Sequence, residues 1–196
     1  MSRVDLQYNT DWWIPVDLDR EPEQWVPELA RQRWAEDGHP DNPLLLEAVI
    51  EGLVAVVEAV LVTEPPVFMA LLLHPRSDDG AAAVATVRTE DLDEPMDLDE
   101  VVAELTLEPQ LLEAPAEICR LDTRGGPAVR IVQRYRMPEE PHWESVMESL
   151  LYAWVVHDED GTPLLLTFST AFEDLVKAEE LRPLVEDVAR TLAVVD

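Results

Sequence analysis

Arginine side chains gather in one part of the sequence, in a pattern that could bind anions. Five of them fall within a short stretch that contains only one acidic residue: Arg120, Arg124, Arg130, Arg134 and Arg136. Because side chains two residues apart share a face of a β-strand, Arg130, Arg134 and Arg136 would lie together. A guanidinium binds a carboxylate or a phosphate through paired hydrogen bonds. The spacing predicts an anion-binding face, to which Arg120 could be added from the facing strand of a hairpin.

The charge of the whole chain supports a second interpretation of these arginines. The 196 residues include 14 Lys and Arg against 42 Asp and Glu, a formal net charge of −28. Residues 90–117 contain only acidic charges. The arginines would then neutralise carboxylates elsewhere in the fold, and in so negative a chain we favour this structural interpretation. The same charge predicts no nucleic-acid partner and no anionic membrane as a partner, since both would repel the protein.

Four sequence motifs of common enzyme classes are missing from the sequence. It lacks the P-loop sequence, the dinucleotide-binding sequence Gly-x-Gly-x-x-Gly, the nucleophile sequence Gly-x-Ser-x-Gly and the zinc sequence His-Glu-x-x-His. The single cysteine, Cys119, cannot form an intrachain disulfide, and we expect a buried, unreactive thiol. We therefore predict a protein that is not an enzyme, with no catalytic residue, no cofactor and no metal.

An acidic tetrapeptide, Asp-Leu-Asp-Glu, occurs twice, at residues 91–94 and 97–100. Paired carboxylates could bind Ca²⁺, but the glycine that an EF-hand loop requires is missing. The favoured interpretation is a loop that leads into a helix. Asp97 would cap that helix, and Asp99 and Glu100 would stabilise its first turn.

Helices are predicted before, within and after the strands. Residues 44–62 form an apolar run with a stripe of three carboxylates at Glu47, Glu51 and Glu58, preceded by Asn42 as N-cap and by Pro43. The carboxylates predict a largely buried helix that does not span a membrane. Upstream, a helix should begin near Pro27, and further helices are expected at 97–107 and at 181–193, the last with Pro183 in its first turn.

Six apolar runs are predicted to be strands, and turn sequences join them into three hairpins. Hairpins imply antiparallel pairing, and helices must cover the apolar faces of such a sheet. We predict one α+β domain over residues 1–196, with an arm and helices in 1–62, the sheet in 66–170, an inserted helix near 97–107 and a closing helix at 181–193. The strands are expected at 67–73, 81–87, 117–122, 128–136, 145–157 and 164–170.

Two adjacent tryptophans, Trp12 and Trp13, lie in a short strand or extended arm at residues 12–16. Exposed aromatic side chains bind partner proteins, and Trp12 and Trp13 are therefore candidate partner-binding residues. The alternative is that the pair packs against the edge of the protein's own sheet.

The N-terminal residues and the cysteine count bear on location. Residues 1–13 contain no basic segment followed by an apolar run, so we expect no signal peptide or lipoprotein leader. One cysteine disfavours a secreted, disulfide-stabilised scaffold. We predict a cytoplasmic protein.

Residues 117–196 resemble the PsbP-like superfamily, including its small actinobacterial members. The resemblance rests on the strand sequences at 128–136, 150–156 and 164–170 and on the helix sequence at 181–188. It implies an antiparallel sheet flanked by helices and a non-enzymatic role in binding or assembly. Many members are exported or lipid-anchored, which differs from the location expected here. The superfamily shares a scaffold more than a site, so it assigns no functional residue.

Three functions remain open at this point. The first is a non-enzymatic intracellular protein that binds a protein partner or forms a homo-oligomer. The second is a small-molecule-binding domain or enzyme with a cleft lined by Arg120, Arg130 and Arg134. The third is an acidic inhibitor that imitates DNA and occupies a basic protein.

Overall fold

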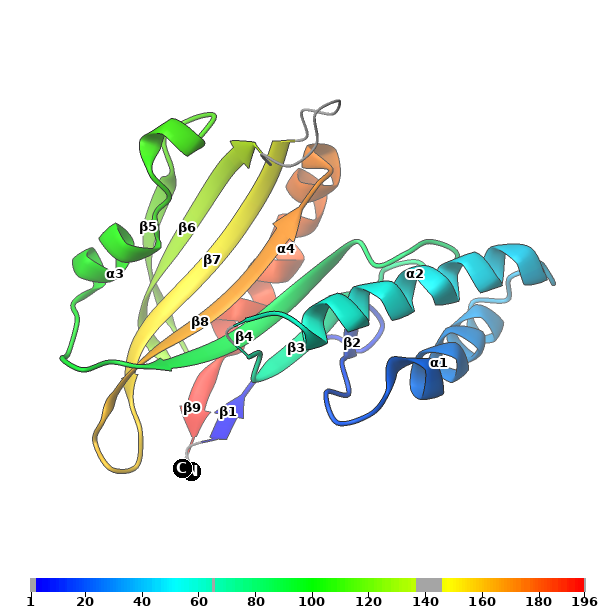
Figure 1. Ribbon diagram of the computed structural model, residues 1–196, viewed down its shortest axis with the longest axis horizontal. Helices are drawn as coiled ribbons and strands as arrows, with labels where there is room; N and C mark the ends of the chain where they lie inside the picture. Colours follow the sequence, from blue (N-terminus) through cyan, green and yellow to red (C-terminus); the bar gives the residue numbers. More distant parts are fainter. Residues whose placement is uncertain (1–2, 65, 137–145, 196) are drawn as a thin grey trace. The chain divides into compact units, whose positions relative to one another are not determined.

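Seven strands form one antiparallel sheet in the computed structural model, which describes residues 3–64, 66–136 and 146–195 (Figure 1). The strand order is β2-β3-β4-β8-β7-β6-β5. All three predicted hairpins are present in it, as β3–β4, β5–β6 and β7–β8. The predicted α+β class is therefore confirmed, and the sheet has one strand more than the six expected because the arm at residues 12–16 contributes β2.

The chain divides into two compact units. Residues 9–86 form the first, which we call the N-terminal unit, and residues 1–8 together with 87–196 form the second, which we call the sheet unit. Strand β4 (Ala83–Asp91) begins in the N-terminal unit and ends in the sheet unit.

The N-terminal unit consists of β2 (Trp13–Pro15), α1 (Pro22–Glu36), α2 (Pro43–Leu61), β3 (Met69–Leu73) and the start of β4. Its core contains Trp25, Val26, Ala30 and Trp34 of α1, and Val49, Leu53, Val57 and Val60 of α2, packed with Ile14 and Leu72 of the strands. The two helices lie side by side.

Helix α1 begins at Pro22 and includes Pro27, which corrects the predicted start near Pro27. Pro22 occupies the first helical position, where a missing N–H has no cost. Pro27 removes one interior hydrogen bond. Its neighbours Trp25 and Val26 are buried, and this burial holds the helix together across the proline.

Helix α2 begins as predicted, because the Asn42 side chain accepts a hydrogen bond from the Leu45 amide and Pro43 opens the helix. The expectation that it is largely buried is wrong. Only one side is buried, and Leu44, Leu45 and Leu61 are exposed together with the three glutamates. Periodicity located the exposed glutamates, but the width of the exposed face depends on which elements cover the helix.

The sheet unit contains β5 (Glu117–Thr123), β6 (Gly126–Arg136), β7 (Val146–His157) and β8 (Pro163–Phe172), with residue 145 of the predicted third hairpin outside the described residues. Helix α4 (Leu175–Thr191) packs on one face. Helix α3 (Leu98–Leu105) packs on the other, where Val101 meets Val129, Ile131 and Ala153. A 3₁₀ turn, η1 (Pro109–Leu111), follows α3.

The cap predicted for α3 is present. Asp97 accepts hydrogen bonds from the amides of Asp99 and Glu100 at 2.8 and 2.9 Å, and the Glu100 carboxylate accepts one from the Asp97 amide at 2.8 Å. This reciprocal arrangement is a capping box. The carboxylates of residues 97–100 therefore stabilise a helix start, as the favoured interpretation expected.

Helix α4 begins at Leu175, six residues before the predicted closing helix, and contains Pro183 in its interior. Asp174 supplies the cap, since its carboxylate accepts hydrogen bonds from the amides of Val176 and Lys177. The apolar spacing was evident only from Leu181 onward, whereas the first turns have exposed residues and gave no such signal.

The two ends of the sheet unit also pair with each other. Strands β1 (Arg3–Asp5) and β9 (Ala193–Val195) form a separate antiparallel ribbon, drawn in blue and red in Figure 1. Arg124, in the turn between β5 and β6, forms an ion pair with Asp5 at 2.7 Å. The β1–β9 pairing joins residues from opposite ends of the sequence, and no local sequence pattern predicted it.

Gly125 lies in the same turn, and a Cβ atom there would stand 2.7 Å from the Leu192 carbonyl oxygen. We expect Gly125→Ala to lower the free energy of unfolding by about 1–3 kcal/mol, because a backbone atom must move to admit the methyl group. Urea denaturation measures this. Gly52→Ala in α2 is the control, since that methyl group meets nothing within 4 Å and should stabilise the helix by about 0.5–1 kcal/mol. Equal effects at both positions would contradict the close approach.

Candidate functional site

The predicted arginines divide between the two faces of the sheet. Antiparallel pairing sets Arg130 opposite Cys119 of β5 and opposite Tyr152 of β7. Arg120 is paired with Val129, so its side chain belongs to the α3 face, whereas Arg130 and Arg134 belong to the α4 face. The register therefore separates Arg120 from the arginines with which it was grouped.

Glu148 is the centre of the arginine contacts on the α4 face. Its carboxylate is fully buried and accepts a hydrogen bond from Arg134 Nε at 2.8 Å and another from Arg182 Nη2 at 2.6 Å. Arg134 comes from β6, Glu148 from the facing position of β7 and Arg182 from α4. The Arg134–Glu148–Arg182 cluster thus ties two strands and the helix together through charge-assisted hydrogen bonds.

A second cluster lies further along α4. Glu186 accepts a hydrogen bond from Arg130 Nη1 at 2.7 Å and from Arg190 Nη2 at 2.6 Å. Burial alone would raise the pKa of the Glu186 carboxyl, but the hydrogen bonds and charges of Arg190 and Arg130 hold that pKa below its usual value. Beside it, burial raises the pKa of the Tyr152 hydroxyl. Arg130 is therefore engaged by a carboxylate of its own chain.

The two remaining arginines of the predicted face also contact carboxylates. Arg136 donates to Glu113, and Arg120 donates to Asp99 beside the start of α3. All four candidate ligand-binding arginines thus contact acidic side chains, as the structural interpretation expected. An anion would have to compete with these carboxylates, and the assignment of an anion site to the four arginines stays a prediction.

The candidate partner-binding tryptophans differ in accessibility. Trp12 is 38% exposed, and Trp13 is 2% exposed within β2. Strand β2 is an edge strand of the sheet, and Trp13 is paired there with Leu73. Of the two, only Trp12 presents a partly exposed ring to a partner.

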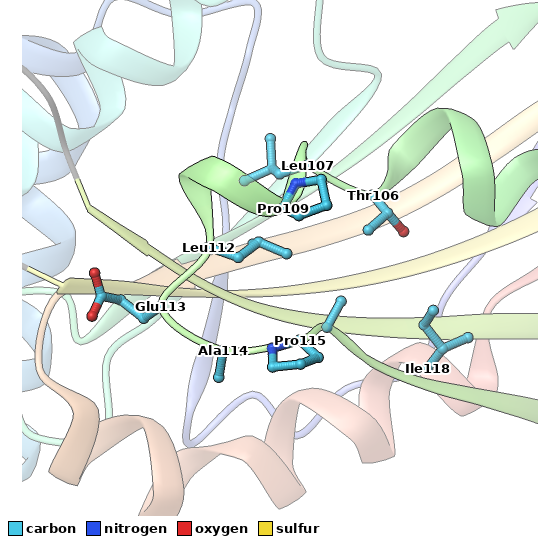
Figure 2. A pocket seen from close by; sticks show the side chains of 9 residues that line it. Thr106, Leu107, Pro109, Leu112, Glu113, Ala114, Pro115 and Ile118 are labelled. Atoms are coloured by element: carbon cyan, nitrogen blue, oxygen red, sulfur yellow. The ribbon is translucent and has the colours of Figure 1, made fainter.

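Sequence reasoning missed an apolar pocket in the sheet unit, with a volume of about 550 Å³, between the segment that follows α3 and the first residues of β5 (Figure 2). Its walls are almost entirely carbon. Figure 2 shows the Glu113 carboxylate directed away from Pro109, Leu112 and Ile118. The lining residues are Thr106, Leu107, Pro109, Leu112, Glu113, Ala114, Pro115, Ala116 and Ile118.

The sequence of residues 106–116 contains little that predicts this pocket. It has two prolines and several apolar residues but neither a helical nor a strand period, so periodicity assigned it no role. The one available signal was apolar residues that have no regular spacing beside a strand. In the structure, Glu113 donates its amide to Arg134 O at 2.8 Å and Leu112 bridges to Tyr135, which fixes the segment along the end of β6.

The burial and hydrogen bonds of Cys119 and His74 indicate structural roles for both side chains. Cys119 is half-buried on β5, which corrects the expectation of a buried thiol, because β5 is an edge strand that pairs, among the described residues, with β6 alone. His74 is buried, its Nε2 lies 3.0 Å from Asp79 O, and its own carbonyl accepts a hydrogen bond from Arg33. Burial lowers the pKa of the His74 imidazole, so its neutral form is the one that the fold holds.

Within residues 3–64, 66–136 and 146–195, no three His, Cys, Asp or Glu side chains come together as ligands for a metal ion. In the same residues, no helix has both the length and the apolar character that crossing a bilayer requires.

Fold and site together define an α+β protein whose antiparallel sheet is flanked by helices and bordered by an apolar pocket. No protein-family model matches the chain, and no curated protein matches it in sequence. Among solved structures it is similar to LpqN of Mycobacterium tuberculosis, which is involved in cell envelope biogenesis, with a TM-score of 0.54 and 11% identity over 100% of this chain and 85% of that one. At this identity the likeness shows a shared fold alone.

The Arg134–Glu148–Arg182 cluster predicts non-additive energetics. Arg134→Ala or Arg182→Ala alone leaves Glu148 one guanidinium, whereas the double variant leaves a buried charge without a partner and should lose about 3–5 kcal/mol, more than the two single losses together. Urea denaturation of the four proteins measures the coupling. Adding Glu148→Gln to the double variant should restore part of the loss, and strict additivity would contradict the role of the cluster.

The buried His74 predicts a loss of stability in mild acid. Unfolded His74 binds a proton as the pH falls below about 6.5, whereas the folded state resists protonation, so the unfolded state gains protons and stability falls by up to about 1.4 kcal/mol per pH unit. Thermal melting between about pH 7 and pH 5, above the range in which most carboxylates titrate, measures this. His74→Gln should flatten the profile, and the matched change at exposed His157 should not.

Proposed function

We propose that this chain is a non-enzymatic, cytoplasmic protein that binds a protein partner, and that the apolar pocket between residues 106 and 118 is part of its binding site. The observation that carries the proposal is the pocket itself. It is of the size at which proteins bind an apolar group. Its lining residue Ile118 is exposed, and so is Leu111, which precedes the lining residue Leu112 in the sequence.

The chemistry of the pocket favours binding over catalysis. Of its lining side chains only Thr106 and Glu113 carry a polar group, and the Glu113 carboxylate accepts a hydrogen bond from Arg136. Hydrogen bonding to Arg136 lowers the pKa of the Glu113 carboxyl, so the carboxylate is ionised and is a poor proton donor near neutral pH. An apolar cavity bordered by exposed leucine and isoleucine is typical of an anchor site for a side chain.

The proposal includes the cytoplasmic location and the membership of the PsbP-like superfamily that the sequence indicates. The single cysteine supports the first, and the antiparallel sheet flanked by helices is compatible with the second. The involvement of LpqN in cell envelope biogenesis is not transferred to this chain, because 11% identity supports a common fold and no common site.

A photo-crosslinking amino acid at position 118 tests the proposal in cells that produce the protein. Ile118 is 49% exposed at the pocket, and Val176, 77% exposed on α4, is the matched control position. We expect one recurrent protein adduct from position 118 and none from position 176. The adduct should disappear when Leu112→Gln makes the pocket more polar.

Three outcomes decide this test. Loss of the adduct in a folded Leu112→Gln variant supports the proposal. An adduct of twice the chain mass identifies a second copy as the partner, which the proposal also allows. Absence of an adduct at position 118, or one that the pocket variant leaves unchanged, contradicts it.

A further inference from the structure

Strand β5 ends the sheet on the side of the pocket. Among the described residues it pairs with β6 alone, and no residue of the strand is buried. The outer edge of such a strand presents backbone N–H and C=O groups that another extended chain can pair with. Edge strands are therefore common sites for the addition of a peptide strand.

The pocket adjoins the first residues of β5. Ile118 is both the second residue of β5 and a lining residue of the pocket, and Leu107 and Leu112 line the same pocket from the preceding segment (Figure 2). Along an extended peptide, alternate side chains point to the same face. A peptide paired with β5 would thus present every second side chain to the face on which Ile118 lies, and one of them could enter the pocket.

The charge around the groove indicates what kind of peptide it suits. From Asp97 to Asp122 the chain carries eight carboxylates and one arginine, Arg120, which already contacts Asp99. Two of these carboxylates are neighbours of lining residues in the sequence, although they do not line the pocket themselves. Glu108 lies between Leu107 and Pro109, and Glu117 lies between Ala116 and Ile118. Basic side chains would be attracted to this edge, and acidic ones repelled.

This charge also discriminates against a second copy of the chain. Two copies joined at β5 would bring the same carboxylates together, and each copy carries a net charge of −28. Like charges placed face to face oppose association. A self-complementary contact at this edge is therefore disfavoured by the electrostatics that favour a basic partner.

We infer that the partner is a basic, extended segment of another protein, which adds to the free edge of β5 and inserts an apolar side chain into the pocket lined by Leu107, Leu112 and Ile118. This inference rests on the proposed protein-binding function and specifies its partner. The backbone of β5 supplies affinity without regard to sequence, the pocket selects an apolar side chain, and the carboxylates select positive charge.

A synthetic peptide with alternating lysine and leucine or valine, labelled with a fluorophore, is the probe. Fluorescence anisotropy should show binding that weakens as salt is added, and a matched peptide with glutamate in place of lysine should not bind. Ile118→Gln should weaken binding about tenfold or more, the change expected when an apolar anchor is removed, and Val176→Gln should not. Circular dichroism shows that each variant is folded.

Charge and backbone are tested separately. Glu108→Gln with Glu117→Gln should weaken binding several-fold, whereas Glu47→Gln with Glu51→Gln on α2 removes the same net charge and should leave it unchanged. Two further peptides are N-methylated at alternate residues, the first along one edge of the extended peptide and the second along the other edge. Each keeps its side-chain charges but loses the backbone N–H donors along its methylated edge. One of the two must fail to bind if the peptide pairs with β5.

The outcomes distinguish this inference from the function on which it rests. Equal binding by both N-methylated peptides, or equal effects of the two glutamate pairs, contradicts the inference that a basic, extended segment pairs with β5. A position-118 adduct would then still support the proposed protein partner. A dimer in light scattering that Ile118→Gln abolishes overturns it in favour of a second copy. Absence of both the adduct and peptide binding overturns the inference and the proposed function together.

Discussion

The contact on which the sheet unit depends is the burial of Glu148 between Arg134 and Arg182. A carboxylate removed from water is costly unless its charge and lone pairs are satisfied, and here two guanidiniums from different elements do so. The cluster therefore requires α4 to lie over β6 and β7 in one register. A sheet face that receives Phe168, Phe172 and Leu150 from the strands could pack a helix in several ways, and the buried charge selects one.

The need of carboxylates for guanidinium partners also accounts for where the few positive charges of the chain are used. With three acidic residues for every basic one, the arginines of β5 and β6 contact carboxylates of the chain itself. These carboxylates lie in the clusters on the α4 face, at the start of α3 and in the segment before β5. Residues 97–122 still carry eight carboxylates, of which Asp99 and Glu113 contact arginines. The positive face suggested by the sequence is thereby largely neutralised, and the accessible edge at β5 is acidic.

Much of the fold followed from local patterns because hairpin turns, helix caps and two-residue or 3.6-residue periods depend on neighbouring residues. The Asp97 capping box and the three hairpins are examples. Patterns failed where burial by distant elements decided the outcome. Pro27 lies within α1 because Trp25 and Val26 are buried around it, α4 begins at Leu175 before its apolar spacing is evident, and α2 is covered on one side only.

The candidate site shows the same division. The sequence by itself determined that acidic side chains dominate, that arginines concentrate in residues 120–136 and that an apolar segment rich in proline precedes a strand. Only the tertiary structure decided that Arg120 faces away from Arg130, that each candidate arginine contacts a carboxylate, and that residues 106–118 enclose a pocket. Register, strand order and cavity shape arise from contacts between residues far apart in the chain, and such contacts leave no periodic signal in the sequence.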